Sequence, residues 1–309
     1  MNIGIIGAGA MGCLFASLLS SAHRVALYDI SRSVVDTVNQ NGVRILEQSG
    51  NVGTFYPSVW QNGRDTEEKE LVILFVKATA TRFSLAANRA LFGEQTILLS
   101  LQNGMGNKEV IETFFPRERI LLGTTKHNAV STAPGEVFHA GAGATVIGSP
   151  SGNEGVAFRV TEAFRAAGIE TEFSSDVKRL LWEKLFLNMT INPITALLGK
   201  KIGFVAGNEF SRALTRTLIS EAVTVARADG EEFRTDELFR SVIHTAEILA
   251  EGKTSMCQDI EKKCPTEIDY INGAVVRLGQ KYRIPVPTHE AIVRLIHAKE
   301  KSILEGQNL

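Results

Sequence analysis

Cysteine, proline and one-signed charge runs are all scarce in this chain of 309 residues. Its three cysteines, Cys13, Cys257 and Cys264, are odd in number and lack CxxC spacing, so neither a disulfide framework nor a metal site is predicted. A formal net charge of −1 without Lys/Arg clusters indicates no nucleic-acid or membrane partner. Apolar runs stay below the roughly 18 residues of a membrane span. The N-terminus lacks the basic segment with which a signal peptide begins. A cytoplasmic protein is expected.

Two domains are expected, since about 150 residues make a typical domain. The first half alternates helical patterns with short strand-like segments, which predicts a parallel sheet with crossover helices. These segments are NIGII, RVALY, LVILFV, TILLSL and RILLGTT. Residues 43–60 and 126–150 instead have the broken pattern of added antiparallel hairpins. From about residue 176 only helical periodicity follows. We therefore predict an α/β domain over 1–175 and an all-helical domain over 176–309, with Ser175 or Asp176 capping its first helix.

A glycine-rich turn follows the first predicted strand and opens a helix. Gly7, Gly9 and Gly12 spell GxGxxG there. In this context the first glycine permits a tight turn, the second lets the backbone approach a pyrophosphate, and the third lets helix and strand pack closely. The helix N-terminus adds free N–H groups for the phosphates. The motif predicts a Rossmann-type dinucleotide site formed by Gly7, Ala8, Gly9, Ala10, Met11 and Gly12.

Asp29 ends the second predicted strand, 22 residues after Gly7. An acidic residue there usually binds the adenosine ribose hydroxyls and favours NAD, because its charge repels the 2′-phosphate of NADP. Arg32 follows closely, however, and an arginine at this turn binds such a phosphate. Both cofactors therefore stay open. Alternatively, Asp29 only caps the next helix.

Two further polar residues follow later strands. Lys77 comes after LVILFV, and Asn103 lies in LQNGMGN after TILLSL. Ligands of open α/β sheets lie beyond the carboxyl ends of the strands, so both residues are candidates to meet the cofactor or its reaction partner. A solvated loop lysine and simple turn chemistry are the competing interpretations. The glycines of NGMG would also let the backbone approach a ligand.

A polar stripe interrupts the apolar stretch LLWEKLFLNMTINPITALL. Lys184, Asn188 and Asn192 are spaced by four residues and so share one face of a helix. Reduction of a ketone leaves developing negative charge on oxygen, which needs a proton donor and hydrogen-bond donors. The competing interpretation is a structural lysine paired with a carboxylate, beside two asparagines that cap neighbouring helices. Pro193 is expected to end the helix just after Asn192.

Several segments together resemble the ketopantoate reductase family, also called 2-dehydropantoate 2-reductases. They are GAGAMG, the Lys77 position, LQNGMGN, WEKLFLNMTINPITAL and KTSMCQDIEKKCPTEIDYINGAVV, in the family's order along nearly the whole chain. The resemblance implies an N-terminal Rossmann domain, an all-helical C-terminal domain and reduction of 2-dehydropantoate to (R)-pantoate with NADPH. It implies a small 2-keto acid as the binding partner and leaves a homodimer open.

The resemblance also implies a role for individual residues. Lys184 matches the general acid, and Glu267 matches a glutamate near that lysine and the cofactor ribose. Asn188 and Asn192 match ligands of the substrate hydroxyl, and Ser255 matches a serine that binds the substrate carboxylate. The remaining matches are Asn103, which contacts cofactor and substrate, and Lys77 and Ala129 on the cofactor side.

Three other functions stay open. Family members that use NADPH commonly have a basic residue where this chain has Asp29, so an NADH-dependent D-2-hydroxyacid dehydrogenase for branched or aromatic 2-keto acids is the main rival. A β-hydroxyacid dehydrogenase shares the lysine–asparagine pair, but its lysine follows a glycine-rich turn, whereas Trp182 and Glu183 precede Lys184 here. A catalytically silent nucleotide-binding protein would not need Lys184 and Ser255.

Overall fold

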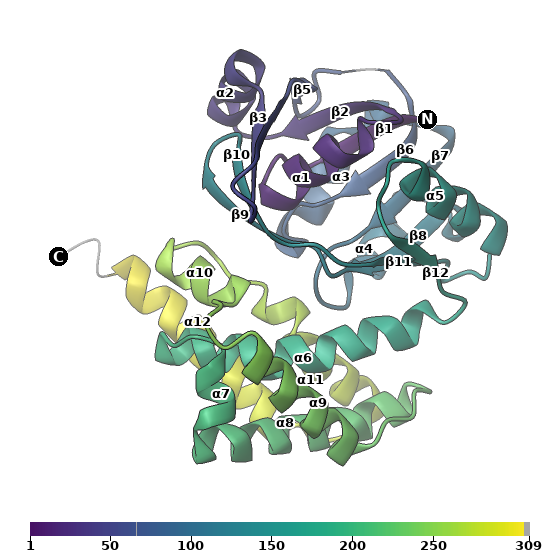
Figure 1. Cartoon of the computed structure of the whole chain (residues 1–309). Coiled ribbons are helices and arrows are strands. Elements are labelled where there is room, and N and C mark those ends of the chain that lie inside the picture. The colour runs from purple at the N-terminus through teal and green to yellow at the C-terminus, as the bar shows by residue number, and fades with distance from the viewer. Residues whose placement is uncertain (66, 306–309) are drawn as a thin grey trace. The chain divides into compact units, whose positions relative to one another are not determined.

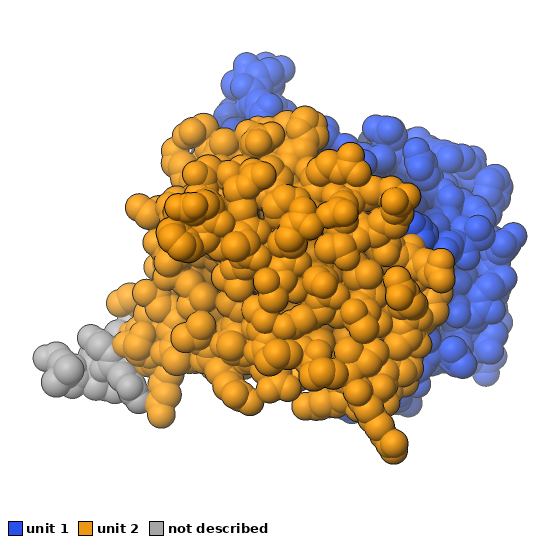
Figure 2. All heavy atoms as spheres, turned by 90° about the horizontal axis from the view of Figure 1, so that it is seen from below, with its two compact units in different colours: residues 1–102, 107–180 blue, residues 103–106, 181–309 orange. Residues whose placement is uncertain are grey.

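The computed structural model describes residues 1–65 and 67–305. Contacts divide the chain into two compact units, coloured separately in Figure 2. The first unit contains residues 1–102 and 107–180, and the second contains residues 103–106 and the chain from 181 onward. The division falls within helix α6 (Val177–Leu198). The predicted domain boundary between residues 175 and 176 lies just before this helix and stays a prediction.

An eight-stranded sheet forms the centre of the first unit, in the order β12-β11-β8-β7-β6-β1-β2-β5 (Figure 1). The strands from β5 to β8 are parallel, which confirms the predicted parallel-sheet domain. All five predicted strand segments lie in this parallel part. The strands are β1 (Asn2–Ile6), β2 (Arg24–Asp29), β5 (Ser58–Gln61), β6 (Lys69–Leu74), β7 (Phe92–Ser100), β8 (Ile120–Thr125), β11 (Thr145–Gly148) and β12 (Thr171–Phe173).

The added strands are only partly antiparallel hairpins. β3 (Val43–Glu47) pairs antiparallel with β4 (Val52–Phe55), and β9 (Asn128–Ala133) pairs antiparallel with β10 (Glu136–Gly141), in a second sheet of order β4-β3-β10-β9. β3 and β10 are parallel neighbours, however. β5 and β11, expected within the hairpins, instead extend the main sheet. Unpaired backbone groups at a sheet edge favour such additions, since each added strand satisfies them.

Helix α1 (Ala10–Leu19) begins at the glycine turn and packs between the two sheets, against β1 and β2 on one side and β3, β9 and β10 on the other (Figure 1). Leu14 and Phe15 are fully buried in this layer. The other helices of the unit are α2 (Arg32–Asn41), α3 (Thr81–Ala87), α4 (Asn107–Ile111) and α5 (Glu154–Ala166), with 3-10 turns η1 (Ala78–Ala80), η2 (Arg89–Leu91) and η3 (Arg117–Arg119).

The second unit is helical, as predicted. Its described elements are the remainder of α6, α7 (Gly203–Gly207), α8 (Glu209–Ala228), α9 (Thr235–Ile248), α10 (Ser255–Glu261), η4 (Ile268–Tyr270), α11 (Asn272–Tyr282) and α12 (Pro287–Glu305). Trp182, Phe186 and Met189 of α6 are fully buried in its core. Every helix within the described ranges is too short or too polar to cross a membrane.

Helix α6 begins as predicted but ends later. The N–H of Arg179 donates to Oδ1 of Asp176 at 3.1 Å, which confirms Asp176 as the cap. The prediction that Pro193 ends the helix is wrong, because α6 continues through it to Leu198. Proline removes one backbone donor and crowds one carbonyl, so a helix continues past it only where neighbours compensate. Asn188 and Asn192 therefore lie on a continuous helix.

Candidate active site

The glycine turn has the geometry of a dinucleotide site. Gly7 has a φ of +107°, and a Cβ there would lie 2.8 Å from the backbone nitrogen of Val76. A Cβ at Gly12 would overlap the carbonyl oxygen of Gly7. Gly9, by contrast, faces open space. The chain's own packing thus requires the first and third glycines, whereas the second leaves room for a ligand, as a pyrophosphate site requires.

Asp29 is tied to this turn. Its Oδ2 accepts the N–H of Ala8 at 2.8 Å, and its Oδ1 accepts the N–H of Ser31 at 2.9 Å. The interpretation that Asp29 caps the next helix is wrong, because Ser31 caps α2 by accepting the N–H of Val34 at 3.4 Å. A carboxylate has about four acceptor sites, so these two contacts use half of them. Arg32 is exposed, with its Nε 3.6 Å from Oδ2 of Asp36.

Lys77 and Ala129 also belong to the first unit. Lys77 is half-buried beyond the end of β6 and precedes η1. Ala129 lies in β9, opposite His139 of β10.

His139 contacts the Glu47 carboxylate at 2.9 Å through Nδ1 and His127 at 3.1 Å through Nε2. Burial and the adjacent His139 lower the pKa of His127. This carboxylate–histidine–histidine row joins β3, β10 and the start of β9.

Asn103 belongs to the second unit, because its loop docks there. The N–H of Met105 donates to the carbonyl of Tyr270 at 2.8 Å, and Nη2 of Arg277 donates to the carbonyl of Met105 at 3.1 Å. Gly104 has a φ of +82°, and a Cβ there would overlap the carbonyl oxygen of Tyr270. At Gly104 the missing side chain makes room for Tyr270, and the expected close approach of the loop backbone to a ligand stays a prediction. The loop places Asn103 on the same body as Glu267.

The predicted polar stripe of Lys184, Asn188 and Asn192 lies along one face of α6. Lys184 and Asn188 are half-buried, and Asn192 is only 6% exposed. Burial lowers the pKa of Lys184 to about 8, although the negative charge of Glu267 acts in the opposite direction. Glu267 is therefore close enough to interact electrostatically with Lys184. This ammonium is a stronger acid than an ordinary lysine and is still mostly protonated at neutral pH.

Ser255 is the exposed first residue of α10 and is connected to α6 through its neighbour. Thr254 caps α10 by accepting the N–H of Cys257 at 3.2 Å. The Oγ1 atoms of Thr254 and Thr195 are hydrogen-bonded at 2.8 Å, and both residues are buried. All six predicted catalytic and substrate residues therefore lie in the second unit. They are Asn103, Lys184, Asn188, Asn192, Ser255 and Glu267.

No local signal in the sequence points to the residues that hold this site. Arg277, Thr195 and Asn272 act through contacts with distant segments: Arg277 fixes the Asn103 loop, Thr195 fixes the start of α10, and Asn272 contacts α6. Their residue types are common in helices. Asn272 and Thr195 do lie within two of the family-like segments, TEIDYINGAVV and NPITAL, whereas Arg277 lies outside both.

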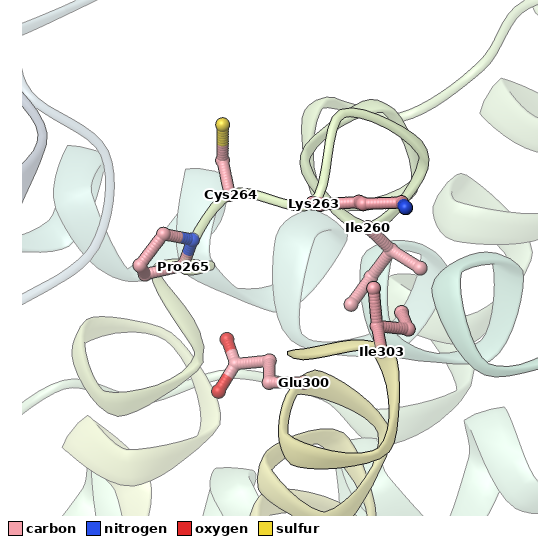
Figure 3. Close-up of a pocket in the computed structure, with 6 residues that line it drawn as sticks. All are labelled: Ile260, Lys263, Cys264, Pro265, Glu300 and Ile303. Carbon is pink, nitrogen blue, oxygen red and sulfur yellow. The ribbon is translucent and has the colours of Figure 1, made fainter. Parts of the chain in front are cut away.

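A surface pocket of the second unit is separate from these residues. It is lined by Ile260, Lys263, Cys264, Pro265, Glu300 and Ile303. Figure 3 shows the Lys263 ammonium and the Cys264 thiol pointing in different directions, away from the Glu300 carboxylate. Glu300 already accepts the N–H of Thr266 at 2.7 Å. The polar groups do not converge on one ligand, so this pocket is not the candidate active site.

Family comparison covers both parts of the chain. Residues 3–152 match the model for ketopantoate reductase PanE/ApbA, and residues 176–300 match the model for its C-terminal domain. A 2-dehydropantoate 2-reductase of Streptococcus pyogenes serotype M3 is 32% identical over 97% of this chain and 98% of its own length. One from Pyrococcus abyssi is 33% identical over 99% of this chain and 100% of its own.

Solved structures show the same fold. A D-mandelate dehydrogenase with NADH and anilino(oxo)acetate has a TM-score of 0.94 at 29% identity, covering 98% of this chain and 99% of its own. A 2-dehydropantoate 2-reductase from Geobacter metallireducens has a TM-score of 0.90 at 29% identity, and the match covers 96% of this chain and 99% of the Geobacter chain. The relatives thus include two substrate types on one architecture.

The glycine turn yields a paired prediction. Gly12→Ala is expected to lower the free energy of unfolding by about 1–3 kcal/mol or more, because the new methyl group overlaps backbone. Gly9→Ala is expected to change it by less than about 1 kcal/mol while weakening nicotinamide-cofactor binding, because its methyl group enters the open space. Urea unfolding and cofactor titration of both variants check this. Equal effects of the two variants on stability would contradict it.

The Lys184 environment yields a second prediction. Competitive labelling of its amine across pH should give a titration midpoint near pH 8. Glu267→Gln should move that midpoint lower, because loss of the negative charge disfavours the ammonium. Glu209→Gln, at an exposed position on α8, is the matched control and should leave the midpoint unchanged. A midpoint near 10 in the parent protein would contradict the burial argument.

Proposed function

Because the chain belongs to the ketopantoate reductase family, whose members are NAD(P)-dependent oxidoreductases, we propose that it reduces 2-dehydropantoate to (R)-pantoate. The observation that carries the proposal is the α6 face. It presents Lys184, with a pKa lowered to about 8, in line with two amide side chains, and Glu267 lies within electrostatic range. This face combines a proton donor with neutral hydrogen-bond donors.

The proposed chemistry assigns one task to each group. When bound, the nicotinamide cofactor supplies a hydride to the C2 carbon of the ketone. Lys184 donates its proton to the carbonyl oxygen, so that hydride and proton together give the alcohol. Glu267 keeps Lys184 charged despite its burial. A pKa of about 8 suits the task, because catalytic acids work best with a pKa near the operating pH.

The remaining side chains of the second unit would bind the substrate. Asn188 and Asn192 offer amides to the substrate hydroxyl without adding charge, and the hydroxyl of Ser255 would donate to its carboxylate. Asn103, on the loop that Tyr270 and Arg277 hold, would contact cofactor and substrate. The Thr195–Thr254 hydrogen bond supports this assignment, because it connects the Ser255 position to the helix that carries the acid.

A second candidate is an NADH-dependent D-2-hydroxyacid dehydrogenase for branched or aromatic 2-keto acids. Two observations favour it. Asp29 ends β2, and a D-mandelate dehydrogenase with bound NADH matches with a TM-score of 0.94. The same Lys184 chemistry would apply, since both reactions reduce a 2-keto acid. The two candidates therefore differ in the substrate side chain and not in the acid.

For the cofactor, we propose a preference for NADH. Two hydrogen bonds hold the Asp29 carboxylate beside the glycine turn, where it would meet the adenosine ribose. Like charges about 4 Å apart repel by roughly 1 kcal/mol in water and more where water is partly excluded, which disfavours a 2′-phosphate. Arg32 is the group whose positive charge would instead favour a 2′-phosphate. Its Nε lies 3.6 Å from Oδ2 of Asp36, so a neighbouring carboxylate already offsets part of that charge.

The direct test is a panel of initial rates. The purified protein is assayed with 2-dehydropantoate, a branched 2-keto acid and benzoylformate, each with NADH and NADPH. The proposal expects the highest kcat/KM with 2-dehydropantoate. Higher kcat/KM with an aromatic or branched acid would select the second candidate, and no turnover with any pair would leave only a nucleotide-binding role.

Lys184→Ala should lower kcat by about 100-fold or more, on the scale of a lost general acid, while cofactor affinity is nearly unchanged. Lys200→Ala removes an exposed lysine two residues beyond α6 and is the matched control. Steady-state kinetics and cofactor titration of both variants check this expectation. Near-normal turnover of the Lys184 variant would remove this lysine from the mechanism.

The cofactor turn is tested by two opposite substitutions. Asp29→Ala should raise kcat/KM for NADPH relative to NADH, because a repelling charge is lost. Arg32→Ala should do the opposite, because a guanidinium can hold a phosphate through two parallel hydrogen bonds. Both ratios are measured in the parent and in both variants. If neither ratio moves by more than about twofold, some 0.4 kcal/mol, this turn does not select the cofactor.

A further inference from the structure

Pro193 leaves a carbonyl of the α6 helix without its usual donor. In an α-helix each carbonyl accepts the N–H four residues later, and proline has none. The carbonyl concerned is that of Met189, a fully buried residue between Asn188 and Asn192. The helix nevertheless continues to Leu198. The orphaned carbonyl therefore lies on the same turn as the proposed substrate ligands.

Asn272 supplies the missing donor. It is the fully buried first residue of α11, and its Nδ2 donates to the carbonyl oxygen of Met189 at 2.9 Å. A carbonyl only accepts hydrogen bonds, so the NH₂ end of the amide must face it. A residue 83 positions away in sequence thus takes the place of a backbone N–H.

His289 fixes the orientation of that amide. It is also fully buried, and its Nε2 contacts the carbonyl of Leu218 at 3.0 Å, so Nε2 carries the proton. Nδ1 is then an acceptor, and it lies 3.2 Å from Nδ2 of Asn272. The two hydrogens of the amide are therefore shared between Met189 and His289. This arrangement requires His289 to be neutral.

The two ends of the Asn272 amide differ in their hydrogen bonding. Oδ1 of Asn272 is buried without a hydrogen-bond partner among the residues that the structure describes. Both donors of Asn272 are used, and they serve α6 and the histidine that orients it.

We propose that Asn272 is a positioning residue for catalysis: its amide replaces the backbone N–H that Pro193 removes and so fixes the α6 turn that carries Asn188 and Asn192, one turn beyond Lys184. The proposal rests on the proposed function, in which these side chains bind and protonate the substrate. On the far side of Pro193 the Thr195–Thr254 hydrogen bond holds the next turn of the helix. The polar face is thus fixed before and after the proline.

The chain offers its own rescue experiment. Asn272→Leu keeps the approximate size of the side chain and removes both donors. Pro193→Ala restores a backbone N–H to the Met189 carbonyl, so the double variant gives that carbonyl a partner again. Val225→Ala, at a fully buried position in α8, is the control for loss of stability alone. Thermal unfolding shows which variants are folded at the assay temperature.

Two readouts are measured in the folded variants. Asn272→Leu should lower kcat about tenfold with little change in cofactor KM, and the double variant should recover to within about threefold of the parent. The proton affinity of Lys184, obtained from its titration midpoint by amine labelling, should change at least about threefold in Asn272→Leu. It should return to the parent value in the double variant. Val225→Ala should alter neither readout.

The labelling readout needs no substrate, so it separates this proposal from the proposed function. If the parent fails to turn over 2-dehydropantoate, the proposed function fails, while the Lys184 titration still decides the role of Asn272. An unchanged Lys184 midpoint in folded Asn272→Leu overturns the proposal. Rescue of thermal stability without rescue of kcat in the double variant also overturns it, because Asn272 would then serve folding only.

Discussion

The chemistry proposed for this protein depends on an ammonium that stays charged although its side chain is partly removed from water. Burial disfavours the charged form of Lys184, and the carboxylate of Glu267 favours it, which leaves a pKa of about 8. Too much burial would neutralise the lysine, and too much neighbouring negative charge would make it a weak acid. The placement of Glu267 and the packing of α6 are therefore parts of one balance.

Helix α6 has to meet two requirements: most of its surface must be apolar to pack in the core, and one face must be polar to carry Lys184. Trp182 and Phe186 anchor it in the core of the second unit. Polar atoms near Pro193 find specific partners: the hydroxyl of Thr195 contacts the carbonyl of Ile191 at 2.9 Å, and Asn272 serves Met189. A buried carbonyl left unpaired costs about 1–3 kcal/mol, and the Asn272 amide offsets the loss of the donor that Pro193 removes.

In the first unit, one charged side chain, the Asp29 carboxylate, has two local roles. Asp29 organises the glycine turn through the N–H of Ala8 and the start of α2 through the N–H of Ser31. The same carboxylate places negative charge where an adenosine ribose would lie. In the proposed cofactor assignment, the residue that stabilises the turn is therefore also the residue that disfavours a 2′-phosphate.

Local signals in the sequence predict the parallel strands, the GxGxxG turn, the helical second half and the spacing that puts Lys184, Asn188 and Asn192 on one helix face. The roles of these side chains remain proposals. Long-range contacts instead establish that β5 and β11 join the main sheet, that α6 passes through Pro193, and that Tyr270 fills the space beside Gly104. The reason is physical: periodicity is written in neighbouring residues, whereas each of these outcomes depends on a partner far away in the chain, as Asn272 is for Met189.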